Sequence, residues 1–268
     1  MRRGMKRVVA AWEARQRTSG EPSSGNGASS FHLLWDLPQV PLAEVAATLE
    51  VVVPPMVPRL YFWALQVSFA SSARLQGGAH LGLQWNPRHP GSTAVCWGGY
   101  GPGERSHTTL DGTESAMPGL RGDPNTRHFT WEPGHRYRLR ISRAPERLTE
   151  GGAWRGSVTD LEQGVESVVR DLFSRGEYLF SPMVWSEVFA RCEHPSVSVR
   201  WSDFEAKAAT GETIRPPNVR VNYQTRADGG CANTTVSVDE LGILQITAVE
   251  RQVPQAAVLP VPYPGPQA

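Results

Sequence analysis

Apolar and polar residues alternate along most of the chain, and the alternation is clearest between residues 178 and 206. Trp185 and Glu187 fall on one side of its first run, and Val184 and Val188 fall on the other. A period of two is typical of β-strands, whose successive side chains point to opposite faces. A second alternating run follows after a short break. We therefore predict two adjacent central strands, with Glu187 among large apolar neighbours.

Similar alternation, punctuated by Gly and Pro, predicts further short strands before and after this stretch. They are expected at residues 31–37, 43–53, 59–69, 79–86, 92–100, 153–161, 165–173, 217–225 and 242–250, with a hairpin over 127–144 around the turn EPGH. No internal segment is a convincing helix. The pattern predicts an all-β fold in which two antiparallel sheets pack as a β-sandwich.

The organisation predicted from the sequence has four parts. Residues 1–30 form a basic N-terminal extension and flexible linker, with helical spacing of apolar residues at its start. Residues 31–206 form the sandwich, and residues 207–252 form a C-terminal β appendage packed on it. Residues 253–268 are rich in proline and are expected to be a disordered tail.

Composition narrows the function only slightly. The 268 residues can form one large domain, and a net charge of +1 gives no general attraction to nucleic acid or anionic membranes. No apolar run is long enough to span a membrane. The basic N-terminus is followed by an apolar run too short for a secretory signal, which favours a cytoplasmic location.

The cysteines and histidines of the sequence do not match a known metal-binding or catalytic motif. The three cysteines lack zinc spacing; Cys192 and Cys231 are the pair that could form a disulfide, whereas Cys96 reads as a core thiol. No histidine motif predicts a transition-metal site, and we expect no cofactor. Calcium is the one open alternative, through acidic residues in a long segment over residues 101–126. These residues are Asp111, Glu114 and Asp123.

Several stretches, taken in order, carry a family resemblance. They are YFWALQVSF, GAHLGLQWNP, WGGYGPG, FTWEPGHRYRLRI, WRGSVTD and WSEVF followed by a cysteine. Together they resemble an uncharacterised bacterial domain family, over about residues 31–206, and the segment after residue 217 resembles an appendage of actinobacterial members. The resemblance implies a concanavalin-like jelly-roll β-sandwich. It implies no catalytic residues.

The polar positions of the predicted strands define a candidate binding face. It comprises Gln66, His80, Gln84, Arg138 and Glu187, with Trp97, Tyr100, Trp154 and Trp185 as candidate aromatic walls. Mixed donors and acceptors beside aromatic rings suit a polyhydroxylated ligand. We therefore expect a non-catalytic module that binds a carbohydrate-like ligand. The alternative interpretation is a solvated sheet face with tryptophans in the core.

Two other functions remain open. A glycoside hydrolase would need a second carboxylate facing Glu187, and the candidates are Asp160, Glu132 and Asp203. A polysaccharide lyase would use His80 or Tyr100 as its base. Finally, a structural or interaction protein would use the sandwich only to present loops and tails.

Overall fold

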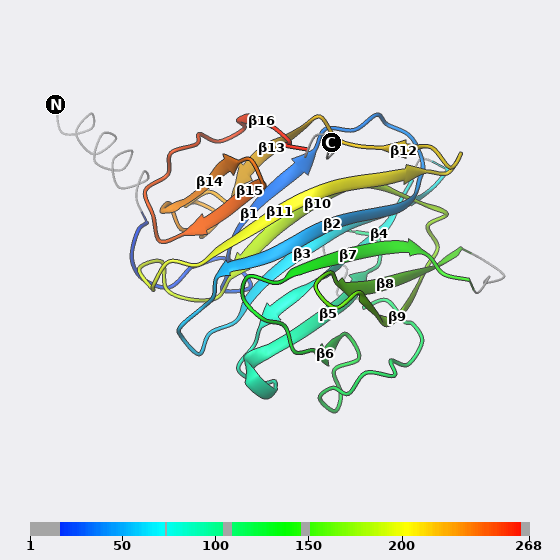
Figure 1. Ribbon diagram of the computed structural model, residues 1–268, viewed down its shortest axis with the longest axis horizontal. Helices are drawn as coiled ribbons and strands as arrows, with labels where there is room; N and C mark the ends of the chain where they lie inside the picture. The colour runs from blue at the N-terminus through cyan, green and yellow to red at the C-terminus, as the bar shows by residue number, and fades with distance from the viewer. Residues whose placement is uncertain (1–16, 73, 104–108, 146–150, 264–268) are drawn as a thin grey trace.

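The structure is a computed structural model that describes residues 17–72, 74–103, 109–145 and 151–263 (Figure 1). Its described residues form a two-sheet antiparallel β-sandwich of jelly-roll type, as predicted. One short 3₁₀ turn, Pro90–Ser92, interrupts the strands. The helix expected near the N-terminus lies outside the described residues.

Two sheets can be traced from the strand pairing, and among the described strands a single residue pair, Leu179–Leu42, joins one sheet to the other. The first sheet has the order β6 (Thr126–His128), β5 (Thr93–Tyr100), β4 (Arg74–Trp85), β3 (Tyr61–Ser71), β10 (Tyr178–Val188), β1 (Ser29–Trp35), β13 (Asn218–Tyr223) and β16 (Val258–Pro260). The second sheet has the order β9 (Val165–Ser174), β8 (Gly152–Asp160), β7 (Arg136–Arg143), β2 (Leu42–Val53), β11 (Ser198–Ala208), β15 (Gly242–Thr247) and β14 (Thr234–Asp239), with β12 (Thr213–Ile214) beside β11.

The main hydrophobic core fills the space between the two sheets. Strand alternation supplies it: Trp63, Leu65 and Val67 of β3 point inward and are at most 1% exposed. Trp201 and Phe204 of β11 enter the same core from the second sheet. Because the inward positions are apolar, the opposite positions on each strand are left to form the outer faces.

One polar side chain crosses this apolar interior. Gln245 on β15 is 1% exposed; its amide nitrogen donates to the Phe31 carbonyl at 2.8 Å. Its amide oxygen accepts from the Ser186 hydroxyl at 2.8 Å and from the Trp201 indole N–H at 2.9 Å. Phe31 and Ser186 belong to the first sheet, and Gln245 and Trp201 to the second. This side chain therefore fixes the position of one sheet relative to the other.

The predicted adjacency of the two strands between residues 178 and 206 is wrong. β10 pairs with β1 and β3 in the first sheet, whereas β11 pairs with β2 and β15 in the second. The break at His194-Pro195 is a crossing between layers and not a hairpin. The hairpin predicted over residues 127–144 is wrong for the same reason, because β6 and β7 also belong to different sheets.

The described part of the C-terminal region, up to Tyr263, is more closely integrated into the fold than predicted. The C-terminal appendage is part of both sheets, since β13 pairs with β1 and β15 pairs with β11. The proline-rich tail contains β16 and continues on the domain to Tyr263, whose hydroxyl donates to the Pro216 carbonyl at 2.8 Å. Proline suits β16 because this strand lies at the edge of its sheet.

The described part of the chain contains no helix with the length and apolar character needed to cross a membrane.

Candidate functional site

The outer face of the first sheet carries a row of residues from neighbouring strands. Strand pairing places Glu187 of β10 opposite Phe62 of β3, and Phe62 opposite Gln84 of β4. Strands in a sheet lie about 4.8 Å apart, so the backbones of Glu187 and Gln84 are about 10 Å apart. Their long side chains can therefore both reach a ligand above the Phe62 ring.

The floor beside this row is aromatic. The Phe62 and Trp185 rings meet edge to face at a centroid distance of 4.9 Å, and the His80 and Trp185 rings do so at 5.9 Å. The Trp185 indole N–H donates to the Gln66 amide oxygen at 2.8 Å. Phe62, Trp185, Ala64 and Cys96 form a small apolar cluster that is separate from the main core. This cluster gives the outer face a closely packed apolar floor.

Gln84 has a fixed amide orientation. The Asn86 side-chain nitrogen donates to the Gln84 amide oxygen at 2.9 Å. The Trp131 indole N–H donates to the Gln84 backbone carbonyl at 3.0 Å, which fixes the main chain at this position. Gln84 is 6% exposed. Because its oxygen is engaged, the remaining function of this side chain is that of an N–H donor.

Glu187 is a half-buried carboxyl between Phe62 and the N-terminal segment. Burial raises the pKa of Glu187 above its ordinary value, because the charged form loses solvation. A hydrogen bond from the Asn26 amide nitrogen to Glu187 Oε1, at 2.7 Å, opposes part of this shift. The described residues show no arginine or lysine paired with Glu187. The protonated form of Glu187 therefore persists to a higher pH than it does in an ordinary, solvated glutamate.

Asn26 is held in place by the segment around it. Its side-chain oxygen accepts from the Ser24 hydroxyl at 2.8 Å and from the Ala28 backbone N–H at 3.2 Å. These contacts turn the amide nitrogen toward Glu187. The segment over residues 17–28, predicted to be a flexible linker, thus lies along the edge of the site.

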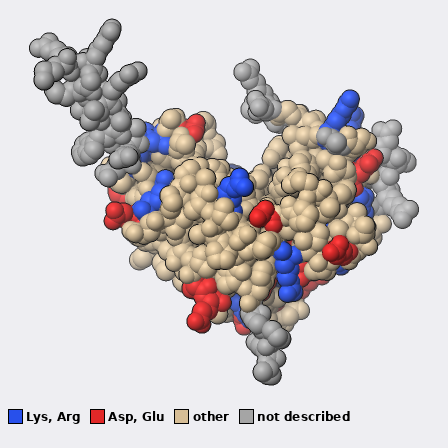
Figure 2. Space-filling view, turned by 90° about the horizontal axis from the view of Figure 1, so that it is seen from above, with Lys and Arg blue, Asp and Glu red and all other residues tan. Residues whose placement is uncertain are grey.

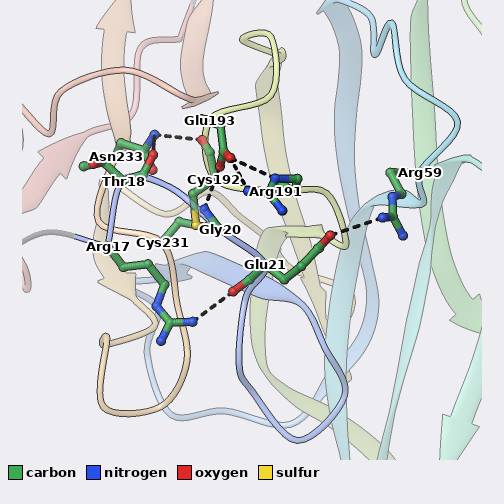
Figure 3. Close-up of polar contacts among 10 residues, drawn as sticks. All are labelled: Arg17, Thr18, Gly20, Glu21, Arg59, Arg191, Cys192, Glu193, Cys231 and Asn233. Atoms are coloured by element: carbon green, nitrogen blue, oxygen red, sulfur yellow. Dashed lines mark hydrogen bonds and ion pairs between the residues drawn. A yellow bond between two sulfur atoms is a disulfide. The ribbon is translucent and has the colours of Figure 1, made fainter.

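A disulfide and several polar contacts anchor that segment (Figure 3). Cys192 and Cys231 are bonded, with sulfur atoms 2.04 Å apart. The Cys192 backbone N–H donates to the Gly20 carbonyl at 2.9 Å, and the Gly20 N–H donates to the Glu193 carboxylate at 2.7 Å. Arg59 pairs with Glu21 at 3.2 Å further along. The bonded loops therefore hold the N-terminal segment from which Asn26 reaches Glu187.

The surface of the molecule is hollowed on the side of the first sheet. Figure 2 shows this hollow between two raised masses, on the side behind the plane of Figure 1. A cavity of about 570 Å³ lies on the same side and includes Leu34 of β1 and Phe180 of β10 in its wall. An extended ligand can therefore lie along the first sheet.

The contact between Asn26 and Glu187 gives a prediction on proton affinity. Asn26→Ala removes a hydrogen bond that stabilises the carboxylate, so the pKa of Glu187 should rise further. The measurement is an NMR titration of the Glu187 side-chain carboxyl carbon in both proteins. Gln163→Ala, at the exposed turn between β8 and β9 of the second sheet, is the control. An unchanged or lower pKa in Asn26→Ala would show that this hydrogen bond does not stabilise the carboxylate.

The structure brings together five of the nine residues predicted to form the binding face. Gln66, His80, Gln84, Trp185 and Glu187 all lie on the outer face of the first sheet. Tyr100 lies at the end of the same face, with its hydroxyl over Gly78.

The other predicted wall residues lie elsewhere. Trp97 and Trp154 are 0% exposed in the main core, because their strand positions face inward. Arg138 lies on β7 of the second sheet, where its guanidinium donates to the Asp203 carbonyl and pairs with Glu205 at 3.8 Å. These three residues are excluded from the candidate site.

The other acidic candidates are also remote from Glu187. Asp160 on β8 and Asp203 on β11 belong to the second sheet, and Glu132 lies in the segment that leads into it. Asp111, Glu114 and Asp123 line a separate cavity of about 950 Å³. Across the residues that the structure describes, no group of three or more His, Cys, Asp or Glu side chains is arranged to hold a metal ion.

Two members of the site were not predicted. Phe62 alternates correctly with the core residues of its strand, so its outward position could have been inferred, but its place between Glu187 and Gln84 depends on strand register. Asn26 lies in the sequence SSGNGASS, which has no periodic pattern. Only the folded position of the N-terminal segment identifies it.

Comparison of the sequence with family models and with curated proteins finds no match. Solved structures with a similar arrangement of strands include Scytalido-glutamic peptidase with a peptide-based transition-state analogue, at a TM-score of 0.46, and SCP-B, a member of the eqolisin family of peptidases, with the tripeptide Ala-Ile-His, at 0.45. Each is 10% identical to this chain, and each match covers 85% of this chain and 98% of the other.

The prediction of a non-catalytic carbohydrate-binding module is wrong in the light of this comparison, since the solved structures that resemble the chain are peptidases. Two of the predicted aromatic walls, Trp97 and Trp154, are also absent from the face that would have stacked on sugar rings.

Proposed function

We propose that the outer face of the first sheet hydrolyses peptide bonds, with Glu187 as the acid–base residue. One observation carries this proposal. Glu187 is the only acidic residue in the eight strands of the first sheet, and it lies half-buried in one row with an oriented amide donor, Gln84.

The proposed reaction needs one carboxyl group, one amide and one water molecule. Ionised Glu187 takes a proton from water as the water oxygen attacks the peptide carbonyl carbon. The electron pair of the C=O bond moves to oxygen, and the amide N–H of Gln84 stabilises the oxyanion. Protonated Glu187 then donates its proton to the peptide nitrogen as the C–N bond breaks. The products are a carboxyl group and an amine, and the carboxylate of Glu187 is restored.

The raised pKa of Glu187 suits both halves of this cycle. A carboxyl whose pKa lies nearer to neutral is a better base when ionised than an ordinary glutamate, and it still releases its proton readily. His80 is unsuited to the same role, because burial lowers its pKa to about 4. Glu187 is therefore the stronger candidate for proton transfer on this face.

The substrate class follows from the acidic and amide groups on the outer face of the first sheet. A glycosidase would need two carboxylates across the bond, and the strands of the first sheet supply one. An extended peptide matches the length of a sheet face, and its carbonyl needs one base and one oxyanion donor. The solved structures described above are peptidases, but the proposal depends on Glu187 and Gln84 and not on that distant likeness.

The proposal can be tested by incubating the protein with a mixture of short peptides and identifying new termini by mass spectrometry. We expect cleavage by the unaltered chain. Gln84→Ala should lower kcat/KM by about 10²- to 10³-fold, the effect of removing one oxyanion donor. Gln163→Ala, at the exposed turn between β8 and β9, should leave it unchanged. No cleavage from pH 4 to 8, or cleavage that Gln84→Ala leaves intact, would refute the proposed roles.

A further inference from the structure

A second feature of the first sheet is the cavity of about 570 Å³ beyond the Gln66–Trp185 contact. Its wall includes Leu34 on β1, Phe180 on β10 and Val258 on β16. Leu34 is paired with Met183 on one side and with Arg220 on the other, so this part of the wall lies on the same face as Glu187 and Gln84. Trp35, Leu42 and Val219 line the cavity from the side of the main core. A volume of this size is typical of a ligand-binding pocket.

An irregularity in β10 accompanies the cavity. The register of β10 against β3 shifts between Phe180 and Met183. Ser181 within this bulge has a φ of 48°, a left-handed conformation uncommon for residues other than glycine. Both Ser181 and Pro182 line the cavity. Bulges of this kind interrupt a ladder and redirect side chains, and they are over-represented beside functional sites.

The polar groups of the cavity favour a ligand that accepts hydrogen bonds. Trp35 is 8% exposed and lines the cavity, and its indole N–H is buried without a hydrogen-bond partner. Arg220 is exposed at the wall and makes no ion pair among the described residues. The one carboxylate in the wall is Asp36. A cavity that combines apolar side chains such as Leu34 and Phe180 with a guanidinium and a spare N–H matches an apolar group that carries a carboxylate.

We propose that this cavity binds the C-terminal residue of a peptide, with its apolar side chain in the pocket and its α-carboxylate on Arg220. The inference builds on the proposed function, because it assigns a second part of the same substrate. Met183, in the row of Leu34 and Arg220, is four residues from Glu187 along β10. That separation is about 13 Å, the length of about four extended residues. The site would then release short C-terminal fragments.

The test is a binding measurement on the full chain carrying Glu187→Gln, which retains the surface but lacks the proton-transfer group. Fluorescence anisotropy is recorded with a labelled tetrapeptide ending in leucine, once with a free C-terminal carboxylate and once with a C-terminal amide. We expect the free carboxylate to bind at least about tenfold more tightly. Replacing the final leucine by serine should weaken binding as well.

Three further variants identify the groups responsible. Arg220→Gln should remove the preference for the peptide with a free carboxylate. Asp36→Asn should strengthen binding of that peptide, because it removes a like charge. Arg121→Gln, in a distant loop, should leave the affinity for both peptides unchanged. Equal binding of the two peptides, no binding of either, or a preference that survives Arg220→Gln would overturn the inference. Cleavage by the unaltered chain is scored separately, so the proposed function can stand if the cavity assignment fails.

Discussion

Replacing Glu187 by glutamine should reduce peptide hydrolysis by about 10²- to 10⁴-fold, the usual contribution of a positioned acid–base residue. Glutamine keeps the length of the side chain and can still lie beside Asn26, but it cannot take a proton from water. The loss should appear in kcat and kcat/KM together, because the lost interaction belongs to the transition state. The measurement is steady-state kinetics on any peptide cleaved by the unaltered chain.

The same variant should be more stable than the unaltered chain at neutral pH. Burial raises the pKa of Glu187 in the folded state, so folding favours its protonated form. The resulting contribution to stability is present at low pH and is lost as the pH rises through the folded-state pKa. Glutamine has no charge to desolvate, so Glu187→Gln should have a higher Tm at pH 7 and a smaller advantage at pH 4.

Together these two results separate catalysis from folding. Lower activity with an equal or higher Tm is the expected combination, and it identifies a functional group that is held at a cost in stability. Glu162→Gln, on the exposed turn between β8 and β9, is the matched control and should change neither quantity appreciably. Full activity in Glu187→Gln would exclude Glu187 from proton transfer.

Gln245→Leu should lower the free energy of unfolding by about 3–5 kcal/mol. The substitution removes the partner of three buried groups, the Phe31 carbonyl, the Ser186 hydroxyl and the Trp201 indole N–H. Each buried group left without a hydrogen bond costs about 1–3 kcal/mol, and neighbouring losses are not strictly additive. Domains are stable by only about 5–15 kcal/mol, so this variant should be close to unfolding at 37 °C.

Urea denaturation followed by tryptophan fluorescence measures this effect. Adding Ser186→Ala to Gln245→Leu should recover part of the loss, because it removes one of the unsatisfied groups. Gln163→Leu at an exposed turn is the control for the change of side chain itself. A loss below about 1 kcal/mol would mean that the contacts of Gln245 do not hold the two sheets together.

The fold could be predicted from local alternation, and its topology could not. A period of two at Trp63, Leu65 and Val67 identifies the inward side of β3 without any knowledge of its neighbours. Alternation does not say which strand lies next to which. Alternation therefore divides the stretch from residue 178 to residue 206 correctly into two strands, but it does not show that they lie in different sheets, since sheet membership depends on contacts between residues far apart in the sequence.

The candidate site was predictable to a similar extent. Glu187 stood out because a carboxylate among Trp185 and other large apolar residues needs a reason to be there. Trp97 was misplaced because an aromatic residue in a strand fits a core and a binding wall equally well. Asn26 could not have been found, since a Gly- and Ser-rich segment carries no pattern that specifies where it folds. The prediction of disorder is wrong for the part of the tail that forms β16, because proline content alone does not exclude an edge strand.

The central claim is that Glu187 performs the proton transfer, and the most direct test compares two titrations. One is the pH dependence of kcat/KM for peptide cleavage, and the other is the NMR titration of the Glu187 carboxyl in the same protein. We predict that kcat/KM rises with pH through the pKa measured for Glu187, and that Asn26→Ala moves both midpoints upward together. A pH profile whose midpoint differs from that of Glu187, or stays fixed when the pKa of Glu187 moves, would contradict the claim.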